Sequence, residues 1–453
     1  MNAPSANEGL LLCAKIISLI AIVSSVGWSA GAQVNPQYTT YTNFDQVLEG
    51  QGARYARLTR VSNPGSRERP NYTGFFFYQV LQFDATGRYL LGLRVYFQSR
   101  DVKADDRGDV GYIDLKEGFK WTKIGETTAW NWQQGNRLQW RPHSDEIVWN
   151  DRSDDGKSFI TRVYNFRTRA KRTLPRPIYD LSPDGNTALT HDYERMNLFK
   201  GTEYVGIEDA YEKEFAPSKT GIWKMSVDSG KSDLIMPLDK MAAFAYPKGK
   251  PASGHLYIFR EGWNPSGTRL VTFIKDPANN LFQAWSMTPN GSDVRYFYYN
   301  PSHHAWLDDT HIIDYGRQVP PQGGPAIGGY FLFEDDGSGK AKELLWPSKF
   351  DGHDSFLPAP YGDWIISDTY VISGYQYLFL YHRPTKTFVP LAKLKSTAEN
   401  VANFTGEYRV DLHPRFSRAG RTLCIDSSYE SLGRQMYTID IGYILDHPPH
   451  ASR

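Results

Sequence analysis

The sequence predicts an all-β protein, a seven-bladed β-propeller with four-stranded antiparallel blades. Three observations predict it: the composition, a hairpin pattern that occurs seven times, and a last repeat that lacks its final strand. The 453 residues include 14% aromatic residues, 39 Gly and 27 Pro. Aromatic side chains favour strands, and Gly and Pro spread along a chain suit many short strands joined by turns.

The repeated hairpin starts with a bulky residue, continues through a Pro/Asp/Gly turn and ends in an apolar strand. In such a turn Pro presets φ, and Asp-Gly or Ser-Gly supplies the reversal. The seven bulky residues, which we call anchors, are Phe83, Trp140, Leu181, Trp263, Trp306, Phe356 and Phe416.

Each hairpin is followed by a third strand and usually by a more polar fourth segment. The third strands begin at Gly111, Arg162, Gly221, Ala284, Tyr330, Leu378 and Met436. Seven units of four antiparallel strands describe a propeller. The spacing of roughly 55 residues is longer than that of common propeller repeats, which predicts extended loops. The longest insertion falls in the third unit, between about Met196 and Thr220.

The last unit predicts how the ring closes. Only about a dozen residues follow MYTID (Met436 to Asp440), too few for a good fourth strand. The alternating segment Arg54 to Ser62 precedes the first unit. We expect it to complete the last blade and thereby remove the free sheet edges.

The N-terminus has the pattern of an export signal. Lys15 provides a positive flank, Ile16 to Val26 is a short apolar run, and Ala30-Gly31-Ala32 offers a cleavage site. The expected organisation is a signal peptide over 1–32, an N-terminal segment with the closing strand over 33–65, the propeller over 66–446 and a tail over 447–453. The alternative for the first segment is a buried N-terminal helix.

The number of cysteines indicates the cellular compartment of the protein, and its net charge limits the kinds of partner that it can bind. Loss of the signal would remove Cys13 and leave Cys424 alone, so the mature chain could form no internal disulfide. Export without disulfides favours a bacterial periplasmic or secreted protein, expected to be monomeric and without a membrane span. The 51 basic and 50 acidic residues give no global field for nucleic acid or an anionic membrane.

The common catalytic motifs of hydrolases and nucleotide-binding enzymes are absent from the sequence or occur only in the predicted signal segment. The G-x-S-x-G pattern of serine hydrolases occurs at Gly27 to Gly31, inside the signal segment. The sequence contains no P-loop, no H-E-x-x-H and no cysteine-based zinc motif. No organic cofactor is therefore expected.

Basic residues and histidines recur three positions before the anchors, and this pattern indicates a binding site more strongly than the motifs do. These positions hold Val80, Arg137, Ile178, Arg260, His303, His353 and His413. This register opens the first strand of each blade, nearest the axis, so its side chains should gather at one mouth of the central channel. We expect His303, His353 and His413 to bind a divalent metal (zinc, manganese or calcium), and neutral imidazole suits zinc or manganese.

Two alternatives stay open for this histidine register. His304 could be the ligand in place of His303, and the histidines could merely hydrogen-bond between blades. Arg137 and Arg260 would hold an anionic group of a substrate. His143 lies in a turn and is expected to be structural or exposed.

Six stretches of the sequence carry a resemblance to a known family. They are TAWNWQQGNRLQW (Thr128 to Trp140), NDRSDDG (Asn150 to Gly156), RPIYDLSPDGNTALTHDYER (Arg176 to Arg195), DGHDSF (Asp351 to Phe356), DLHPRFSRAG (Asp411 to Gly420) and GRQMYTIDI. These stretches resemble the propeller polysaccharide lyases, which include ulvan, oligogalacturonate and rhamnose–glucuronate lyases. The resemblance runs from about Phe75 to Ile441; it is specific for this superfamily and much less specific for the glycan that is cleaved.

The resemblance implies cleavage of a uronic-acid-containing polysaccharide or oligosaccharide by β-elimination. In that reaction a base removes the proton beside the carboxylate, and cations stabilise the charge that develops. By resemblance, Tyr179 in PIYDLSPDG corresponds to the catalytic tyrosine, and Arg195 in HDYER to the arginine that neutralises the carboxylate. Packing for Tyr179, and an ion pair with Glu194 or Asp192 for Arg195, are the structural alternatives.

One departure from the family concerns an early histidine that ulvan lyases place beside the tyrosine. Gln133 and Gln134 stand where that histidine would be expected, and His191 is the nearest substitute in sequence. Tyr179 could then act alone as base and acid. Gln133, Gln134 and Tyr193 are expected to contact the substrate. The competing function is a non-catalytic periplasmic propeller that binds protein or glycan through its channel face.

Overall fold

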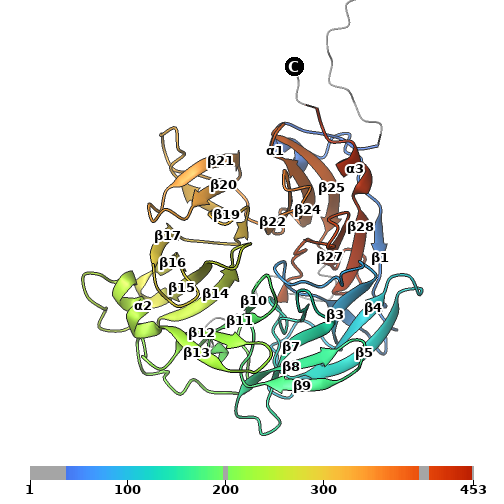
Figure 1. The fold of residues 1–453 in the computed structure, drawn as a ribbon. Helices are drawn as coiled ribbons and strands as arrows, with labels where there is room; N and C mark the ends of the chain where they lie inside the picture. The colour runs from blue at the N-terminus through green and yellow to red at the C-terminus, as the bar shows by residue number, and fades with distance from the viewer. Residues whose placement is uncertain (1–36, 197–201, 397–407, 451–453) are drawn as a thin grey trace, which may run out of the picture.

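The computed structural model describes residues 37–196, 202–396 and 408–450, which form seven four-stranded antiparallel sheets arranged in a ring (Figure 1). The fold class predicted from the sequence is therefore confirmed. The seven third strands fall within observed strands, and the insertion of the third blade separates β11 from β12. The predicted signal peptide lies outside the described residues.

Each of the first six blades uses four consecutive strands, with the first strand nearest the axis. Blades one to three contain β2 (Tyr72–Gly74), β3 (Tyr89–Val95), β4 (Gly108–Asp114) and β5 (Lys120–Thr127); β6 (Gln139–Trp140), β7 (Glu146–Arg152), β8 (Phe159–Asn165) and β9 (Lys171–Leu174); and β10 (Asp180–Leu181), β11 (Thr187–Thr190), β12 (Gly221–Ser226) and β13 (Ser232–Pro237).

The remaining blades follow the same order, except that the seventh takes its outer strand from the N-terminal segment. They contain β14 (Tyr257–Trp263), β15 (Leu270–Asp276), β16 (Leu281–Met287) and β17 (Arg295–Tyr299); β18 (Ala305–Trp306), β19 (His311–Gln318), β20 (Ile327–Glu334) and β21 (Ala341–Pro347); β22 (Asp354–Phe356), β23 (Trp364–Asp368), β24 (Tyr375–His382) and β25 (Thr387–Lys395); and β26 (Arg415–Phe416), β27 (Thr422–Ser427), β28 (Gln435–Asp440) and β1 (Leu58–Arg60).

Helices among the described residues are short and lie outside the sheets. They are α1 (Phe44–Glu49), α2 (Leu238–Ala245), α3 (Gly442–Asp446) and the 3-10 turns η1 (Tyr193–Met196) and η2 (Pro277–Asn279). In α1 the ring of Phe44 packs against Phe379 and Phe388 of the sixth blade, at 5.1 and 5.7 Å between centroids. No helix in the described part of the chain has the length and apolar character needed to cross a membrane.

Strand β1 closes the ring as predicted. Leu58 pairs with Ile439 and Arg60 with Tyr437, and the next residue, Val61, donates its N–H to the Met436 carbonyl at 2.9 Å. The closure covers the edge of β28, which would otherwise expose unpaired backbone groups.

We expect a chain that starts at Asn63 to be less stable by about 3 kcal/mol or more, at about 1 kcal/mol for each lost ladder hydrogen bond. Its exposed β28 edge should also promote self-association. Chemical denaturation and light scattering measure the two effects. An unchanged midpoint together with a monodisperse chain would contradict the role assigned to β1.

The innermost strand of the first blade is interrupted by a buried segment, Phe75–Leu81, that loops out of the sheet. Gly74 pairs with Leu93, whereas Phe83 bridges Leu90 and Gln82 accepts the N–H of Leu91, so Phe75 to Leu81 are not paired with β3. Phe76 adopts a positive φ of 69° and is fully buried. We call residues 75–80 of this segment the plug.

The plug divides the central channel into two cavities. Phe77 lines a cavity of about 350 Å³ together with His303, His353 and His413. Tyr78 lines the other cavity, of about 380 Å³, together with the anchor residue Trp263. Four of the seven positions that stand three before an anchor line the first cavity, namely Arg260, His303, His353 and His413. The second cavity is lined by the anchors Leu181, Trp263, Trp306, Phe356 and Phe416.

Candidate active site

The first cavity collects six of the residues singled out in the sequence. Parallel inner strands bring equivalent positions of successive blades to the same end of the channel, which is why residues far apart in sequence meet here. The six that line the cavity are Gln133, Gln134, Arg260, His303, His353 and His413.

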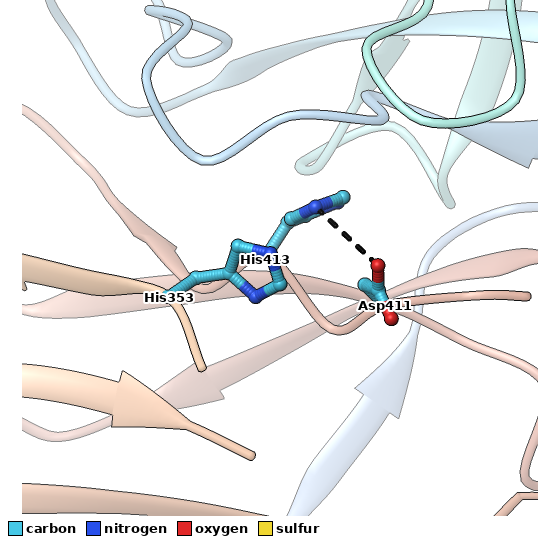
Figure 2. A group of neighbouring side chains, drawn as sticks. All are labelled: His353, Asp411 and His413. Atoms are coloured by element: carbon cyan, nitrogen blue, oxygen red, sulfur yellow. Dashed lines mark ion pairs between the residues drawn. The ribbon is translucent and has the colours of Figure 1, made fainter. Parts of the chain in front are cut away.

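His353 and His413, which line this cavity, form a buried group with the adjacent Asp411, and the ligand atoms of the three all lie within 4.8 Å of one another (Figure 2). The dashed line in the figure joins His413 Nε2 and Asp411 Oδ2, which are 4.0 Å apart. His353 Nδ1 lies 3.0 Å from Asp368 Oδ1, an interaction that orients the ring and leaves Nε2 for another partner. Asp368 also accepts the backbone N–H of His413 at 3.1 Å.

The group fits a divalent transition metal. Two imidazoles and one carboxylate are a donor set that suits manganese or zinc, whereas calcium prefers oxygen ligands alone. Nδ1 of His413 is buried and has no hydrogen-bond partner among the described residues. Burial and the neighbouring His353 lower the pKa of His413 well below its usual value, which keeps the ring neutral as a ligand must be.

The backbone at His413 has a φ of 47°, in the left-handed region that a residue with a Cβ seldom adopts. Such a conformation costs of order 1 kcal/mol and persists where surrounding structure enforces it, often at functional sites. Here the carboxylate of Asp368 holds the backbone of both His353 and His413.

His303 lies beside this group but is bound differently from the sequence expectation. Its ring centroid is 4.1 Å from that of His353, yet its Nε2 lies 2.8 Å from Arg260 Nη2 and its Nδ1 lies 2.9 Å from Ser302 Oγ. Burial, followed by Arg260, lowers its pKa well below the usual value. The third member of the buried group is Asp411, and the metal role of His303 stays a prediction.

The alternative ligand His304 points to the other end of the channel. It lines the second cavity, and its Nε2 lies 3.2 Å from Gln79 Nε2. His143, also on that side, is exposed in its turn.

The cavity walls carry positive charge. Arg260, Lys275 and Arg409 line the cavity, and no Asp or Glu is found among its described lining residues. Arg409 Nε donates to Asp411 Oδ1 at 2.9 Å, which links one cation to the metal-type group. The excess of cations favours an anionic ligand, because a low-dielectric wall focuses the field of its charges.

Tyr179 and Arg137 lie next to this cavity, behind the plug residue Phe77. The Arg137 guanidinium lies 4.0 Å from the Tyr179 ring centroid and 5.1 Å from that of Phe77, and its Nε donates to the Tyr179 carbonyl at 2.8 Å. The Tyr179 hydroxyl and both terminal nitrogens of Arg137 are buried with no hydrogen-bond partner among the described residues. Burial raises the pKa of Tyr179 to about 12.

His191 and Tyr193 extend this cluster away from the cavity. His191 Nδ1 lies 3.2 Å from Glu261 Oε2, and its ring stacks on Tyr193 at 4.5 Å between centroids. Tyr193 is fully enclosed, stacks on Tyr204 and donates its hydroxyl to the Ile178 carbonyl at 3.2 Å. Neither residue lines the cavity that holds the histidine group.

The structure does not bring Arg195 to the cavity. Its guanidinium makes five hydrogen bonds, to the Asp209 carboxylate at 2.8 Å and to four backbone carbonyls, those of Leu256, Tyr211, Glu214 and Phe215. A guanidinium has five N–H donors, so in this arrangement none remains for a substrate carboxylate. The ion pair anticipated with Glu194 or Asp192 is formed with Asp209 instead.

Sequence reasoning missed Asp411, Arg409 and Lys275. Asp411 stands two positions before His413, and a carboxylate so near a predicted histidine ligand was an available signal. Lys275 lies on the second strand of its blade and had no comparable signal.

The fold and this cavity define a seven-bladed propeller with a buried His/Asp group beside a cationic wall. Solved structures with a similar fold include an oligogalacturonate lyase in complex with manganese, with a TM-score of 0.56 and 13% identity over 90% of this chain and 97% of that one. An oligogalacturonate lyase from Vibrio parahaemolyticus has a TM-score of 0.54 and 11% identity over 89% of this chain and 96% of that one.

At these identities the likeness shows the fold. No protein-family model matches the chain. A search of curated proteins likewise finds no match.

Proposed function

We propose that the chain is a lyase that cleaves a uronic-acid-containing glycan by β-elimination. The observation that carries this proposal is the buried group His353, Asp411 and His413 beside a cavity whose described lining includes Arg260, Arg409 and Lys275 and no Asp or Glu. Elimination beside a carboxylate requires positive charge where the enolate develops. The fold likeness to two oligogalacturonate lyases supports the same reaction class.

In this proposal the cavity binds the uronate carboxylate. A manganese or zinc ion held by His353, Asp411 and His413 would act as a Lewis acid toward that carboxylate. Arg260 contributes its Nε, which has no hydrogen-bond partner among the described residues, and the side-chain amide of Gln134 is unpartnered in the same sense. Arg260 and Gln134 both line the cavity. Arg260 can therefore bind the carboxylate, and Gln134 can bind a sugar hydroxyl.

Tyr179 is proposed to take part in proton transfer beside this cavity. With a pKa of about 12 its hydroxyl is protonated at neutral pH, which suits donation to the leaving oxygen better than removal of a proton. We place the protein outside the cytoplasm on the basis of its N-terminal export pattern.

The direct test is to incubate the metal-loaded protein with oligogalacturonates, ulvan and rhamnose–glucuronate glycans, and to follow the ultraviolet absorbance of the unsaturated uronide. Product from any of them supports the proposal. Correctly folded, metal-loaded protein that gives none would contradict it, and would favour a binding propeller if the glycans still bind.

We expect Tyr179→Phe to lower turnover by about 100-fold, the lower end of the usual contribution of a positioned acid or base. The variant should be as stable as the parent or more so, because it removes a buried hydroxyl that has no partner among the described residues. Steady-state kinetics and thermal unfolding measure the two effects. Turnover within about threefold of the parent would remove Tyr179 from the mechanism.

A further inference from the structure

Lys275 is held on the cavity wall by two aromatic rings. Its Nζ lies 3.7 Å from the Phe259 centroid and 4.1 Å from that of Phe282, and all three residues line the cavity. Phe282 is the cross-strand partner of Lys275 on β16. The contacts come from strands on both sides of β15, so the amine has a defined position.

A β-bulge in β14 brings Arg260 to the same wall. The pairing of β14 with β15 shifts register between Ile258 and Arg260, which leaves Phe259 as the extra residue. Successive side chains of a regular strand point to opposite faces, and a bulge relieves this alternation. Phe259 and Arg260 therefore both face the cavity, one against the Lys275 amine and the other beside the histidine group.

We infer that Lys275 is the base that removes the proton next to the uronate carboxylate, an inference that rests on the proposed lyase function. The amine shares a cavity with Arg260 and with the group formed by His353, Asp411 and His413. A carboxylate bound at those groups would lie in the same cavity as the Lys275 amine. In the proposed site His353 and His413 would hold the metal, and His303 is bound to Arg260.

The electrostatic surroundings of Lys275 suit this role at neutral pH. Burial, followed by the charge of Arg260 on β14, lowers its pKa from 10.5 to about 7. Tyr257 is its other titratable neighbour on β14, and His303 faces the cavity as a neutral ring. A general base works best when its pKa lies near the operating pH. The two phenyl rings then stabilise the ammonium that forms, through cation–π contacts.

The proposed step conserves protons and electrons without a co-reactant. The neutral amine takes the C5 proton and becomes an ammonium, and the electron pair of that C–H bond forms the C4=C5 double bond. The C4–O bond breaks, its electron pair stays on the leaving oxygen, and that oxygen receives the proton of the Tyr179 hydroxyl. The ammonium then gives its proton to the medium, and the Tyr179 phenolate takes one from the medium, which restores both groups.

Lys275 could instead serve only as a third cation for the carboxylate, and the Lys275→Arg variant separates the two roles. Arginine keeps the positive charge but does not lose a proton in proteins. A base role predicts that Lys275→Arg and Lys275→Met both lose about 100-fold or more in kcat. A purely electrostatic role predicts that Lys275→Arg keeps most of the activity. Lys231→Met, an exposed lysine in a turn, is the matched control and should behave as the parent.

The experiment measures kcat and KM for the metal-loaded parent and these variants on the glycan that the parent cleaves, with Tm and metal content as checks of integrity. For the parent, kcat/KM should rise about tenfold per pH unit below pH 7 and level off above it, because only the neutral amine acts. The rising limb should vanish in the Lys275 variants. Small primary amines added to Lys275→Ala should restore part of the turnover.

Retention of more than a tenth of the parent kcat by Lys275→Arg would overturn the assignment of Lys275. The assignment would also be overturned if kcat/KM of the parent showed no rise with pH near pH 7. It would likewise be overturned if amines failed to restore turnover to a folded, metal-loaded Lys275→Ala protein. These outcomes leave the lyase proposal intact because the parent still forms the unsaturated product. A parent that forms no such product from any uronate glycan overturns both proposals.

Discussion

Replacing His413 with alanine is expected to abolish metal binding by the isolated protein and to lower any lyase activity by at least about 100-fold. Metal content after loading with manganese or zinc should fall from about one ion per chain to nearly none. His413 supplies one of only three side-chain ligands in the buried group, and its ring is kept neutral by burial. A site with two protein ligands left is a poor one for these ions.

Two further variants sharpen this result. Asp368→Asn keeps the ligands but weakens the partner that orients His353, so metal affinity should drop by about 10–100-fold. His143→Ala removes an exposed histidine at the other end of the channel and should leave the metal content unchanged. Metal analysis after dialysis distinguishes the three cases. A His413→Ala protein that retains the ion at parental affinity would refute the site.

Substituting Asp426 with alanine is expected to destabilise the propeller by about 3–5 kcal/mol, the usual cost of removing one partner of a buried ion pair. Asp426 is fully buried and accepts Arg434 Nη1 at 2.9 Å. It also accepts the backbone N–H groups of Phe75 and Phe76, at 3.2 and 3.0 Å. The substitution therefore leaves a buried guanidinium and two buried amides without this acceptor.

The same carboxylate fixes the plug to the seventh blade, so Asp426→Ala should also loosen the floor of the metal cavity. Urea denaturation measures the stability, and the matched control is Asp446→Ala, which removes an exposed ion pair with Arg421 and should change it little. Equal midpoints for the two variants would show that the anchoring of the plug by Asp426 does not contribute to stability.

The repeat pattern was sufficient to predict the blades and the closure, because both depend on local turn chemistry and on strand alternation. The hairpin at Trp263 follows from turn signals within a few residues, and the pairing of β1 with β28 follows from the missing last strand of the seventh unit. The convergence of Arg260, His353 and His413 could also be predicted, since one strand register repeated around an axis fixes a common end.

Features that depend on irregular backbone could not be predicted. The run FFFYQVLQF at Phe75 to Phe83 looks like a strand, and nothing local indicates that most of it leaves the sheet to form the plug. The bulge at Phe259 turns both Phe259 and Arg260 toward the cavity that Lys275 lines, and bulges have no fixed sequence mark. Arg195 is bound by carbonyls of the third-blade insertion, a contact set by long-range packing.

The closure of the ring by β1 also sets an order of events during synthesis. Leu58 and Ile439 are 381 positions apart (439 − 58), so the ribosome must deliver almost the whole propeller before these two residues can pair. Until then the nascent blades form an open arc with an unsatisfied strand edge, a state prone to association. The pairing of β1 with β28 is therefore the last contact to form, and it ends the period in which the open sheet edge can associate with other chains.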